Sequence, residues 1–261
     1  MLTTTRLKSL FSDKKNNLLS VYFTAGFPQL TDTLPILEAL EAAGADIVEI
    51  GMPYSDPVAD GETIQQSNGT ALDNGMSVAL LFEQLAAMRQ TVTLPVLLMG
   101  YINPVLQFGI EKFCAQCQAV GVDGLILPDL PLQVYEEEYK AIFEKYGLCN
   151  VFLITPQTSE QRIQLIDQLS DSFVYMVSSA SVTGTKTGIS HEQEHYFERI
   201  EVMQLRNPRL IGFGISNHET FATASRHANG AIIGSAFIKL LQKHGASAEA
   251  IKTFVKEIKG L

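Results

Sequence analysis

The sequence predicts an α/β fold, namely a single (β/α)8 TIM barrel over residues 1–261 with an extra helix at its N-terminus. Three observations lead to this prediction. The chain has 261 residues, about the length of one such barrel. Short apolar runs alternate with longer segments of helical periodicity up to the C-terminus, and no linker or low-complexity tract interrupts them. An open doubly wound sheet is the less favoured alternative.

Eight short apolar runs are the predicted strands. Each is apolar enough to be buried on both faces, as strands of a parallel sheet are. They cover residues 19–24, 46–50, 96–99, 124–127, 150–154, 173–177, 210–213 and 231–233.

Amphipathic segments between these runs are the predicted helices, and a short amphipathic stretch over residues 1–11 precedes the first strand. The helices are expected over residues 31–43, 78–90, 110–120, 134–146, 159–170, 191–205, 218–227 and 247–258. Their expected N-caps are Asp32, Ser77, Ser159 and Asn217, and their expected stops are Gly44, Gly121 and Gly147. The loops over residues 51–61 and 178–190 are longer than the usual connection, and we expect both above the catalytic face.

Composition excludes several function classes. No apolar run approaches the roughly 20 residues of a membrane span, and the start lacks a signal-peptide pattern, so we expect a soluble cytoplasmic protein without a membrane partner. A net charge of −9 argues against nucleic acid as a partner. Three cysteines give no disulfide framework.

Two glycine turns late in the chain predict a phosphate site. The segments GFGIS (residues 212–216) and IGSA (residues 233–236) follow the seventh and eighth predicted strands. In barrels these two loops often bind phosphate, because glycine lets backbone N–H groups approach the oxygens. Ser235 can add a hydroxyl. A glycine that simply ends a strand is the alternative for either turn taken alone.

The segment EIGMPYSDPVADG (residues 49–61) carries the candidate catalytic groups. Alternation in the second strand points Glu49 either into the barrel mouth or out toward the helices, and both surroundings are largely apolar. A buried carboxylate is costly unless it is paired or protonated, so we expect Glu49 to have a raised pKa suited to acid–base work. Asp60 lies in a loop that can fold over the mouth, and we expect it to be more solvated. For Asp56, a turn contact is favoured over chemistry.

Other motifs are ambiguous or misleading. Tyr175 can face the same cavity as Glu49 or serve as an ordinary core aromatic. The HEQEH segment over residues 191–195 matches a zinc-peptidase pattern, but Ser190 and Gln193 form a capping box that places the first histidine at the solvent, so we expect no metal. Cys114 and Cys117 are interpreted as packing thiols. The segment over residues 184–187 lacks the glycine-rich run of a nucleotide loop.

Taken together, these motifs closely resemble the tryptophan synthase α subunit family over essentially the whole chain. They are the 49–61 segment, VTG at 182–184, GFGIS, and Gly234-Ser235. The resemblance implies a (β/α)8 barrel that cleaves indole-3-glycerol phosphate to indole and glyceraldehyde 3-phosphate in L-tryptophan biosynthesis. It also implies that Glu49 is the general acid and base, that Asp60 accepts a hydrogen bond from the indole N–H, and that Tyr175 lies beside Glu49.

The resemblance extends to binding residues and partners. It implies an indole pocket formed by Tyr22, Met99, Ile126, Thr183 and Ile232. It implies a phosphate site formed by Gly184, Gly214, Gly234 and Ser235. It also implies two mobile loops that carry Pro53, Asp56 and Thr183. It further implies an α2β2 complex with a β subunit that carries pyridoxal phosphate (PLP), and no cofactor in this chain. Segments 103–104 and 129–131 match the interface side.

Three alternatives remain at this point. The chain could be a stand-alone indole-3-glycerol phosphate lyase, another phosphate-binding barrel isomerase or aldolase, or a non-catalytic subunit that activates a partner. A Schiff-base aldolase requires a lysine at a strand end facing the mouth, and the sequence offers none. A purely regulatory subunit has no need of a costly buried carboxylate at position 49.

Overall fold

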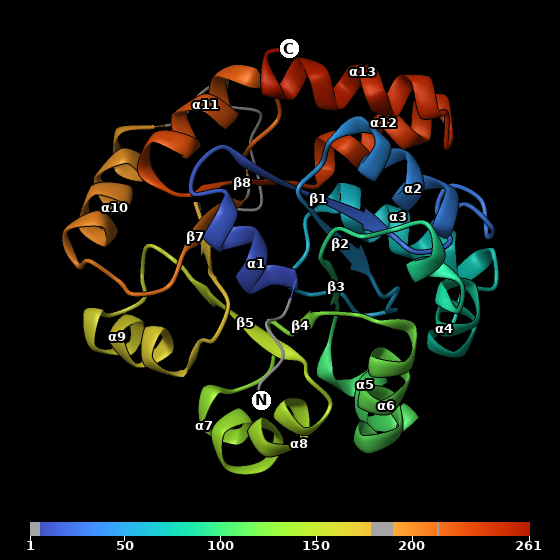
Figure 1. Cartoon of the computed structure of the whole chain (residues 1–261), viewed down its shortest axis with the longest axis horizontal. Coiled ribbons are helices and arrows are strands. Elements are labelled where there is room, and N and C mark those ends of the chain that lie inside the picture. Colours follow the sequence, from blue (N-terminus) through green and yellow to red (C-terminus); the bar gives the residue numbers. More distant parts are fainter. Residues whose placement is uncertain (1–5, 179–189, 213) are drawn as a thin grey trace.

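The computed structural model contains a closed parallel barrel, which confirms the predicted fold class. The structure describes residues 6–178, 190–212 and 214–261. Eight strands pair in sequence order, and the last closes on the first (Figure 1). The strands are β1 Leu18–Thr24, β2 Ile47–Gly51, β3 Val96–Met99, β4 Gly124–Ile126, β5 Cys149–Ile154, β6 Val174–Val177, β7 Arg209–Gly212 and β8 Gly230–Ile233.

Alternation along the strands divides the core into two clusters. Side chains such as Ile47 and Leu97 point inward and fill the barrel with residues from the other strands. Their neighbours Val48 and Leu98 belong to the outer cluster, which packs the strands against the helices. Because side chains on a strand alternate with a period of two, Glu49 shares the inward face of Ile47. Of the two directions left open by the sequence, the inward one is therefore correct.

The surrounding helices agree in part with the prediction. They are α1 Arg6–Asp13, α2 Thr33–Ala43, α3 Glu62–Asp73, α4 Val78–Leu85, α5 Ile102–Phe108, α6 Ile110–Val120, α7 Leu132–Val134, α8 Lys140–Lys145, α9 Glu160–Leu169, α10 His191–Val202, α11 His218–His227, α12 Ser235–His244 and α13 Ala248–Lys259. A 3₁₀ turn, η1 Met88–Gln90, follows α4, and a π-helical segment, η2 Tyr135–Tyr139, joins α7 to α8. The single helices predicted over 78–90 and 134–146 are therefore composite.

The prediction missed three helices. Helix α3 is polar and has Gly69 in its interior, so its apolar stripe is weak. Helix α5 is short and contains Pro104. Helix α12 begins inside the IGSA segment, for which the sequence predicts only the phosphate turn.

Helix caps follow the sequence with one exception. Ser77, Ser159 and Asn217 each accept a backbone N–H of the first turn of their helix. Asp32 precedes α2, as predicted, but its side chain does not cap that helix and instead accepts the N–H of Gln29 at 3.2 Å. Glycines with positive φ end α2 and α6 at the predicted positions 44 and 121.

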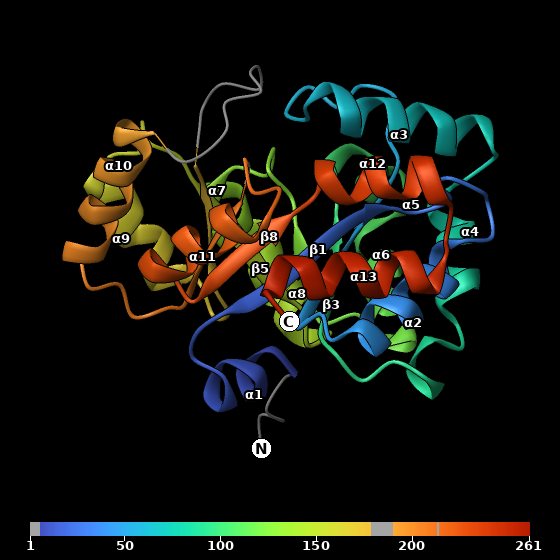
Figure 2. The same ribbon diagram turned by 90° about the horizontal axis from the view of Figure 1, so that it is seen from above.

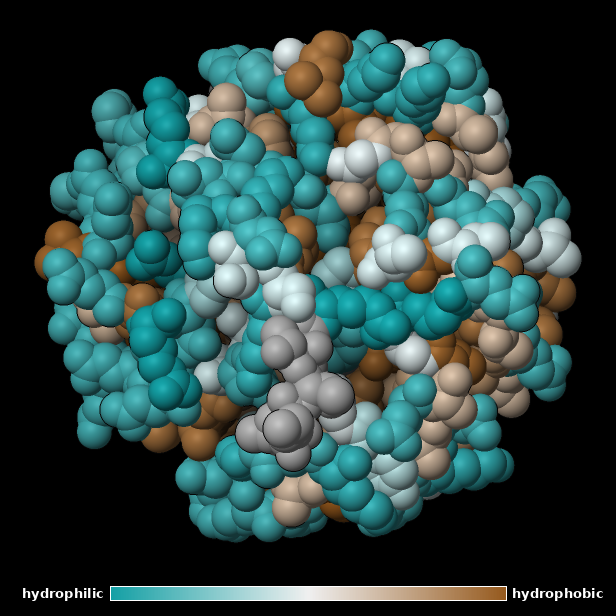
Figure 3. Space-filling model, in the orientation of Figure 1, coloured by the Kyte–Doolittle hydropathy of each residue, from teal (hydrophilic) through white to brown (hydrophobic). Residues whose placement is uncertain are grey.

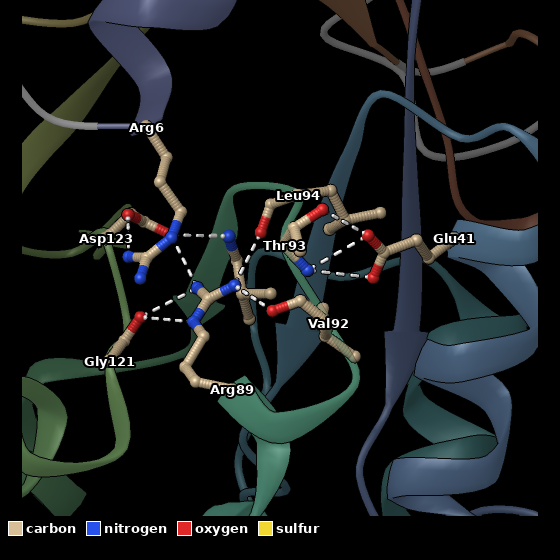
Figure 4. Close-up of polar contacts among 9 residues, drawn as sticks. Arg6, Glu41, Arg89, Val92, Thr93, Leu94, Gly121 and Asp123 are labelled. Carbon is tan, nitrogen blue, oxygen red and sulfur yellow. Dashed lines mark hydrogen bonds and ion pairs between the residues drawn. The ribbon is translucent and has the colours of Figure 1, made fainter.

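Helix α1 covers one end of the barrel, and α3 lies at the opposite end (Figure 2). Leu7 and Phe11 of α1 are buried, and the Phe11 ring lies 5.8 Å from the ring of Phe173 inside the barrel. Arg6 of α1 donates to Oδ1 of Asp123 at 3.0 Å, and Arg89 donates to Oδ2 of the same carboxylate at 2.7 Å (Figure 4). This end of the barrel is thus sealed by apolar packing and by a buried, doubly paired carboxylate.

The two ends of the chain are tied together on the outside of the barrel. Helix α13 packs on α2, and Lys259 of α13 pairs with Asp46 just before β2 at 2.9 Å. Lys14, just after α1, pairs with the other oxygen of Asp46 at 2.6 Å. The molecular face that carries α1 is mostly hydrophilic, with apolar residues in small separate groups (Figure 3). Within the described residues no helix is long and apolar enough to cross a membrane.

Candidate active site

Glu49 is fully buried in the barrel interior near the carboxyl ends of the strands. Its Oε1 accepts a hydrogen bond from the hydroxyl of Ser20 at 2.7 Å, while Oε2 is buried and has no protein partner in the described part of the chain. Burial raises the pKa of Glu49 to about 7, and the Ser20 bond opposes this rise because it stabilises the charged form. Glu49 can therefore exist as acid or carboxylate near neutral pH, as predicted from the sequence.

Asp60 lies two residues before α3, in the loop that connects β2 to this helix. It is half-buried, and its Oδ2 accepts a hydrogen bond from the Tyr101 hydroxyl at 3.1 Å. Burial raises the pKa of Asp60 to about 6, and the Tyr101 bond lowers it. The expectation that Asp60 would be the more solvated carboxylate is correct, but its pKa is shifted in the same direction as that of Glu49.

A small cavity connects Asp60 to the strand ends. Its walls come from β1, the β2–α3 loop and α3, and the segments that follow β3 and β4. It is lined by Tyr22, Met52, Asp60, Asn68, Met99, Gly100, Tyr101 and Pro128. Tyr22 and Met99 were predicted to line an indole pocket, and they do lie together beside Asp60.

Two tyrosines, Tyr22 of β1 and Tyr175 of β6, lie near the two carboxylates. Tyr22 and Tyr175 are both buried, and burial is the main cause that raises the pKa of each phenol. A nearby carboxylate raises it further, that of Asp60 for Tyr22 and that of Glu49 for Tyr175. Each ring fits because the neighbouring strand carries glycine. A Cβ at Gly51 would lie 2.1 Å from the Tyr22 hydroxyl, and one at Gly212 would lie 2.3 Å from the Tyr175 hydroxyl. Tyr175 is therefore an inward-facing core aromatic that lies near Glu49, while other residues line the cavity beside Asp60.

The remaining apolar pocket residues lie deeper. Ile126 of β4 and Ile232 of β8 are buried in the inner cluster together with Tyr175, and Met99 packs against that cluster. They can form the floor below the cavity. Thr183 and Gly184 lie outside the described residues.

Three of the predicted phosphate residues, Gly214, Gly234 and Ser235, follow the neighbouring strands β7 and β8. Gly214 is exposed, with φ of +75°, a conformation that favours glycine. Gly234 precedes the first residue of α12, the exposed Ser235, and the first N–H groups of this helix, which have no partner within the helix, lie at the positive end of its dipole. The arrangement can bind an anion without a lysine.

The loop residues Pro53 and Asp56 lie on the rim of the same end. Asp56 is exposed, accepts the hydroxyl of Ser55, and its carbonyl accepts the N–H of Val58 at 2.9 Å. These are local turn contacts, as the sequence favoured for Asp56. They leave its carboxylate accessible at the surface.

Motifs that suggested other chemistry do not form sites in the described structure. His191 and His195 are exposed, and each pairs with a glutamate of its own helix. The described residues contain no group of three or more His, Cys, Asp or Glu side chains that could hold a metal ion. Cys114 and Cys117 are buried free thiols in the outer core, which confirms the packing interpretation.

Several residues of the site were not found by sequence reasoning. Ser20 and Tyr101 each hydrogen bond a candidate catalytic carboxylate, and Asn68 lines the cavity. Tyr101 was within reach, because a polar residue just beyond the end of a barrel strand, here two residues after β3, lies on the catalytic face. Ser20 and Asn68 carried no such signal, since one is internal to a strand and the other belongs to the helix that was missed.

Comparison with known proteins agrees with this geometry. The family model described as tryptophan synthase alpha chain matches residues 7–260. The tryptophan synthase alpha chain of Flavobacterium johnsoniae is 57% identical over 97% of this chain and 98% of its own length, and that of Parabacteroides distasonis is 51% identical over 97% and 99%.

Solved structures give the same result. The tryptophan synthase complex from Pyrococcus furiosus superposes with a TM-score of 0.86 at 35% identity, covering 95% of this chain and 100% of that one. Mycobacterium tuberculosis tryptophan synthase superposes with a TM-score of 0.87 at 28% identity, covering 98% of each chain. The chain thus belongs to the tryptophan synthase alpha chain family.

Proposed function

We propose that this chain cleaves indole-3-glycerol phosphate to indole and glyceraldehyde 3-phosphate, with Glu49 as general acid and base and Asp60 as the partner of the indole nitrogen. The reaction is a carbon–carbon lyase step of L-tryptophan biosynthesis and is the activity of the family. The observation that carries the assignment is a fully buried carboxyl group, that of Glu49, whose pKa burial raises to about 7, with a second carboxyl group, that of Asp60, in the loop that follows the same strand.

The chemistry requires two proton movements at neighbouring atoms. The acid form of Glu49 donates a proton to indole C3, which leaves a positively charged indolenine whose N–H is stabilised by the carboxylate of Asp60. The Glu49 carboxylate then accepts the proton of the hydroxyl next to the ring. As the carbonyl forms, the carbon–carbon bond breaks and its electrons return to the ring nitrogen, which releases neutral indole.

The other side chains bind and orient the substrate. Tyr175 lies beside Glu49, and Tyr22, Met99, Ile126 and Ile232 supply the apolar surfaces for indole. Thr183 is a further proposed substrate-binding residue. Gly184, Gly214, Gly234 and Ser235 bind the phosphate. Pro53, Asp56 and Thr183 close the loops over the bound substrate and communicate with the partner.

A Schiff-base mechanism has less support. None of the eight strands contains a lysine, so no amine lies on an inward strand position to form an imine with a carbonyl substrate. Two carboxylates with different surroundings instead fit an acid–base retro-aldol cleavage. We propose that this chain uses no cofactor.

A β subunit is the expected partner. One of the similar structures is described as a tryptophan synthase complex, which supports a partner of this kind. We propose an α2β2 assembly in which PLP belongs to the β subunit, which consumes the indole. The rim around Pro53 and segments 103–104 and 129–131 is the proposed contact surface.

The direct test is indole release from indole-3-glycerol phosphate by the purified chain, with and without a β subunit. Glu49→Gln should lower kcat by about 10²–10⁴-fold, because no proton can be donated or accepted. Asp60→Asn should lower it by about 10²–10³-fold, because charge stabilisation is lost. The matched controls are Glu249→Gln and Asp73→Asn, which change exposed residues of α13 and α3 and should leave kcat unchanged.

Three results would separate the alternatives. Slow release alone and fast release with the β subunit supports the complex, whereas fast release alone indicates a stand-alone lyase. Absence of release under both conditions, with folded protein, contradicts the proposed activity.

A further inference from the structure

Tyr101 holds the loop that carries Asp60. Its hydroxyl accepts the backbone N–H of Ala59 at 2.9 Å and donates its own proton to Oδ2 of Asp60 at 3.1 Å. The side chain is 6% exposed and lines the same cavity as Asp60. One hydroxyl thus contacts the main chain of Ala59 and the side chain of Asp60.

The main chain at Asp60 has other supports, but its carboxylate depends on Tyr101. The Asp60 carbonyl accepts Nε2 of Gln65 at 2.8 Å, and its N–H donates to the carbonyl of Pro57 at 3.1 Å. Among the described residues, Tyr101 is the one side chain that donates to the carboxylate. Removing its hydroxyl should therefore free the carboxylate, while the bonds to Gln65 and Pro57 still hold the main chain at Asp60.

The Tyr101 ring is itself held in position. It packs on the ring of Tyr54, with centroids 5.3 Å apart and planes tilted by 34°. The Tyr54 hydroxyl accepts a hydrogen bond from Nδ2 of Asn103 at 3.2 Å. Ile102, which follows Tyr101 in the chain, donates its N–H to Asp129 at 3.0 Å. Because these contacts involve only protein groups, the hydroxyl is oriented before any substrate binds.

We propose that Tyr101 is a positioning residue for Asp60: it holds Oδ2 so that Oδ1 points to the cavity and accepts the indole N–H. This inference rests on the proposed function of Asp60. The hydrogen bond fixes the carboxylate in one rotamer, so no conformational freedom is lost when positive charge develops on the ring.

The surroundings of Asp60 make this bond important for its charge. Burial raises the pKa of Asp60, and the Tyr101 bond is the contact that lowers it. The nearby titratable groups are Tyr22 from β1, which lines the cavity, and Tyr175 from β6 and Glu49 from β2, and none of them supplies a positive charge. Without Tyr101, the acid form of Asp60 should persist to higher pH.

The test is Tyr101→Phe, which keeps the ring and its packing on Tyr54. We expect kcat to fall about tenfold with little change in KM, and the acid limb of kcat/KM, near pH 6 in the parent, to move up by about one pH unit, as expected for loss of a bond to a charged group. Tyr146→Phe is the matched control, because it removes an exposed hydroxyl that donates to Glu111. It should change neither quantity.

A loss of activity that is equal at every pH would indicate a purely structural role and overturn the proposal. The carboxyl carbon of Asp60, followed by ¹³C NMR titration, gives a readout that does not need activity. Its midpoint should rise in Tyr101→Phe even if indole release is absent in all forms of the protein. Failure of the proposed function and failure of this inference are therefore distinguishable.

The wild-type protein provides a second measurement if Tyr101→Phe does not fold. The ζ carbon of Tyr101 should titrate with the same midpoint as the Asp60 carboxyl carbon, because the hydroxyl donates to that group. Independence of the two titrations would contradict the proposal.

Discussion

Glu49 lies in surroundings that favour its uncharged form. Its carboxyl group is fully buried in the barrel interior and, within the described residues, receives one hydrogen bond, from Ser20. The pKa of about 7 in the folded chain exceeds the ordinary value of 4.5. The folded state therefore binds the proton more tightly than the unfolded state does. This proton binding contributes to the free energy of unfolding at low pH, and the contribution is lost as pH rises through about 7.

Glu49→Gln should consequently stabilise the chain at alkaline pH. At pH 8 the charged, buried carboxylate is replaced by a neutral amide, and we expect the free energy of unfolding to rise by up to about 3 kcal/mol. At pH 4 both the folded and the unfolded parent are largely protonated, so the difference should disappear. Thermal unfolding at both pH values measures this, and an equal gain at pH 4 and pH 8 would argue against the titration as its cause.

Sequence reasoning found the catalytic residues more readily than the residues that support them. Glu49 could be identified because a carboxylate in an apolar strand is energetically costly and requires a reason. Ser20 could not, because a serine within a strand is unremarkable until pairing places β1 beside β2. The Asp60–Tyr101 contact spans 41 residues of sequence, so only the closed barrel brings the two together.

At the scale of secondary structure, the strands were easier to predict than the helices. All eight strands were predicted, because burial on both faces leaves continuous apolar runs. Helix α3 was missed because it buries few apolar side chains, mainly Ile64 and Ala71, and owes its place to polar contacts. One such contact joins the hydroxyls of Thr24 on β1 and Ser67 on α3 at 2.7 Å.

The seal formed by α1 and the barrel end yields a stability prediction. Asp123 is 4% exposed and accepts bonds from Arg6, Arg89 and the N–H of Val96. Asp123→Ala leaves these donors without their acceptor, and we expect a loss of about 3–5 kcal/mol in the free energy of unfolding. Chemical denaturation measures this.

The control for this variant is Glu111→Ala, which removes an exposed ion pair with Lys145 and should leave the denaturation midpoint nearly unchanged. Because Asp123 lies at the end of the barrel opposite the cavity, kcat/KM of Asp123→Ala below its melting temperature should match that of the parent. A large loss of kcat/KM in folded protein would show that the two ends are coupled.

At the scale of the whole molecule, the ends of the chain meet. Lys14 and Lys259 both pair with Asp46, and α13 packs its buried face on α2. We propose that residues 1–261 form one domain, since the closure of the barrel and the packing of the last helix both join the N- and C-terminal parts of the chain.

Removal of α13 by ending the chain after position 247 tests this closure. The deletion removes three side chains that are fully or almost fully buried, Ile251, Val255 and Ile258, and uncovers α2. At about 1.5–3 kcal/mol for each side chain, the loss approaches the whole stability of a typical domain, so we expect the truncated chain to be unfolded or aggregated. Removal of the exposed Leu261 alone should have no effect on the melting temperature. A truncated chain with the parent melting temperature would contradict the proposal.

The glycines at the strand ends restrict the order in which this site can change. A Cβ at Gly51 would overlap the Tyr22 hydroxyl, and one at Gly212 would overlap the Tyr175 hydroxyl. A lineage that gains alanine at either position must first have replaced the facing tyrosine with a smaller residue, whereas the reverse order passes through a clashing intermediate. Selection for larger or differently shaped substrates should therefore replace the tyrosines before the glycines. The Gly51–Tyr22 and Gly212–Tyr175 pairs thus set the order in which substitutions can accumulate in this pocket.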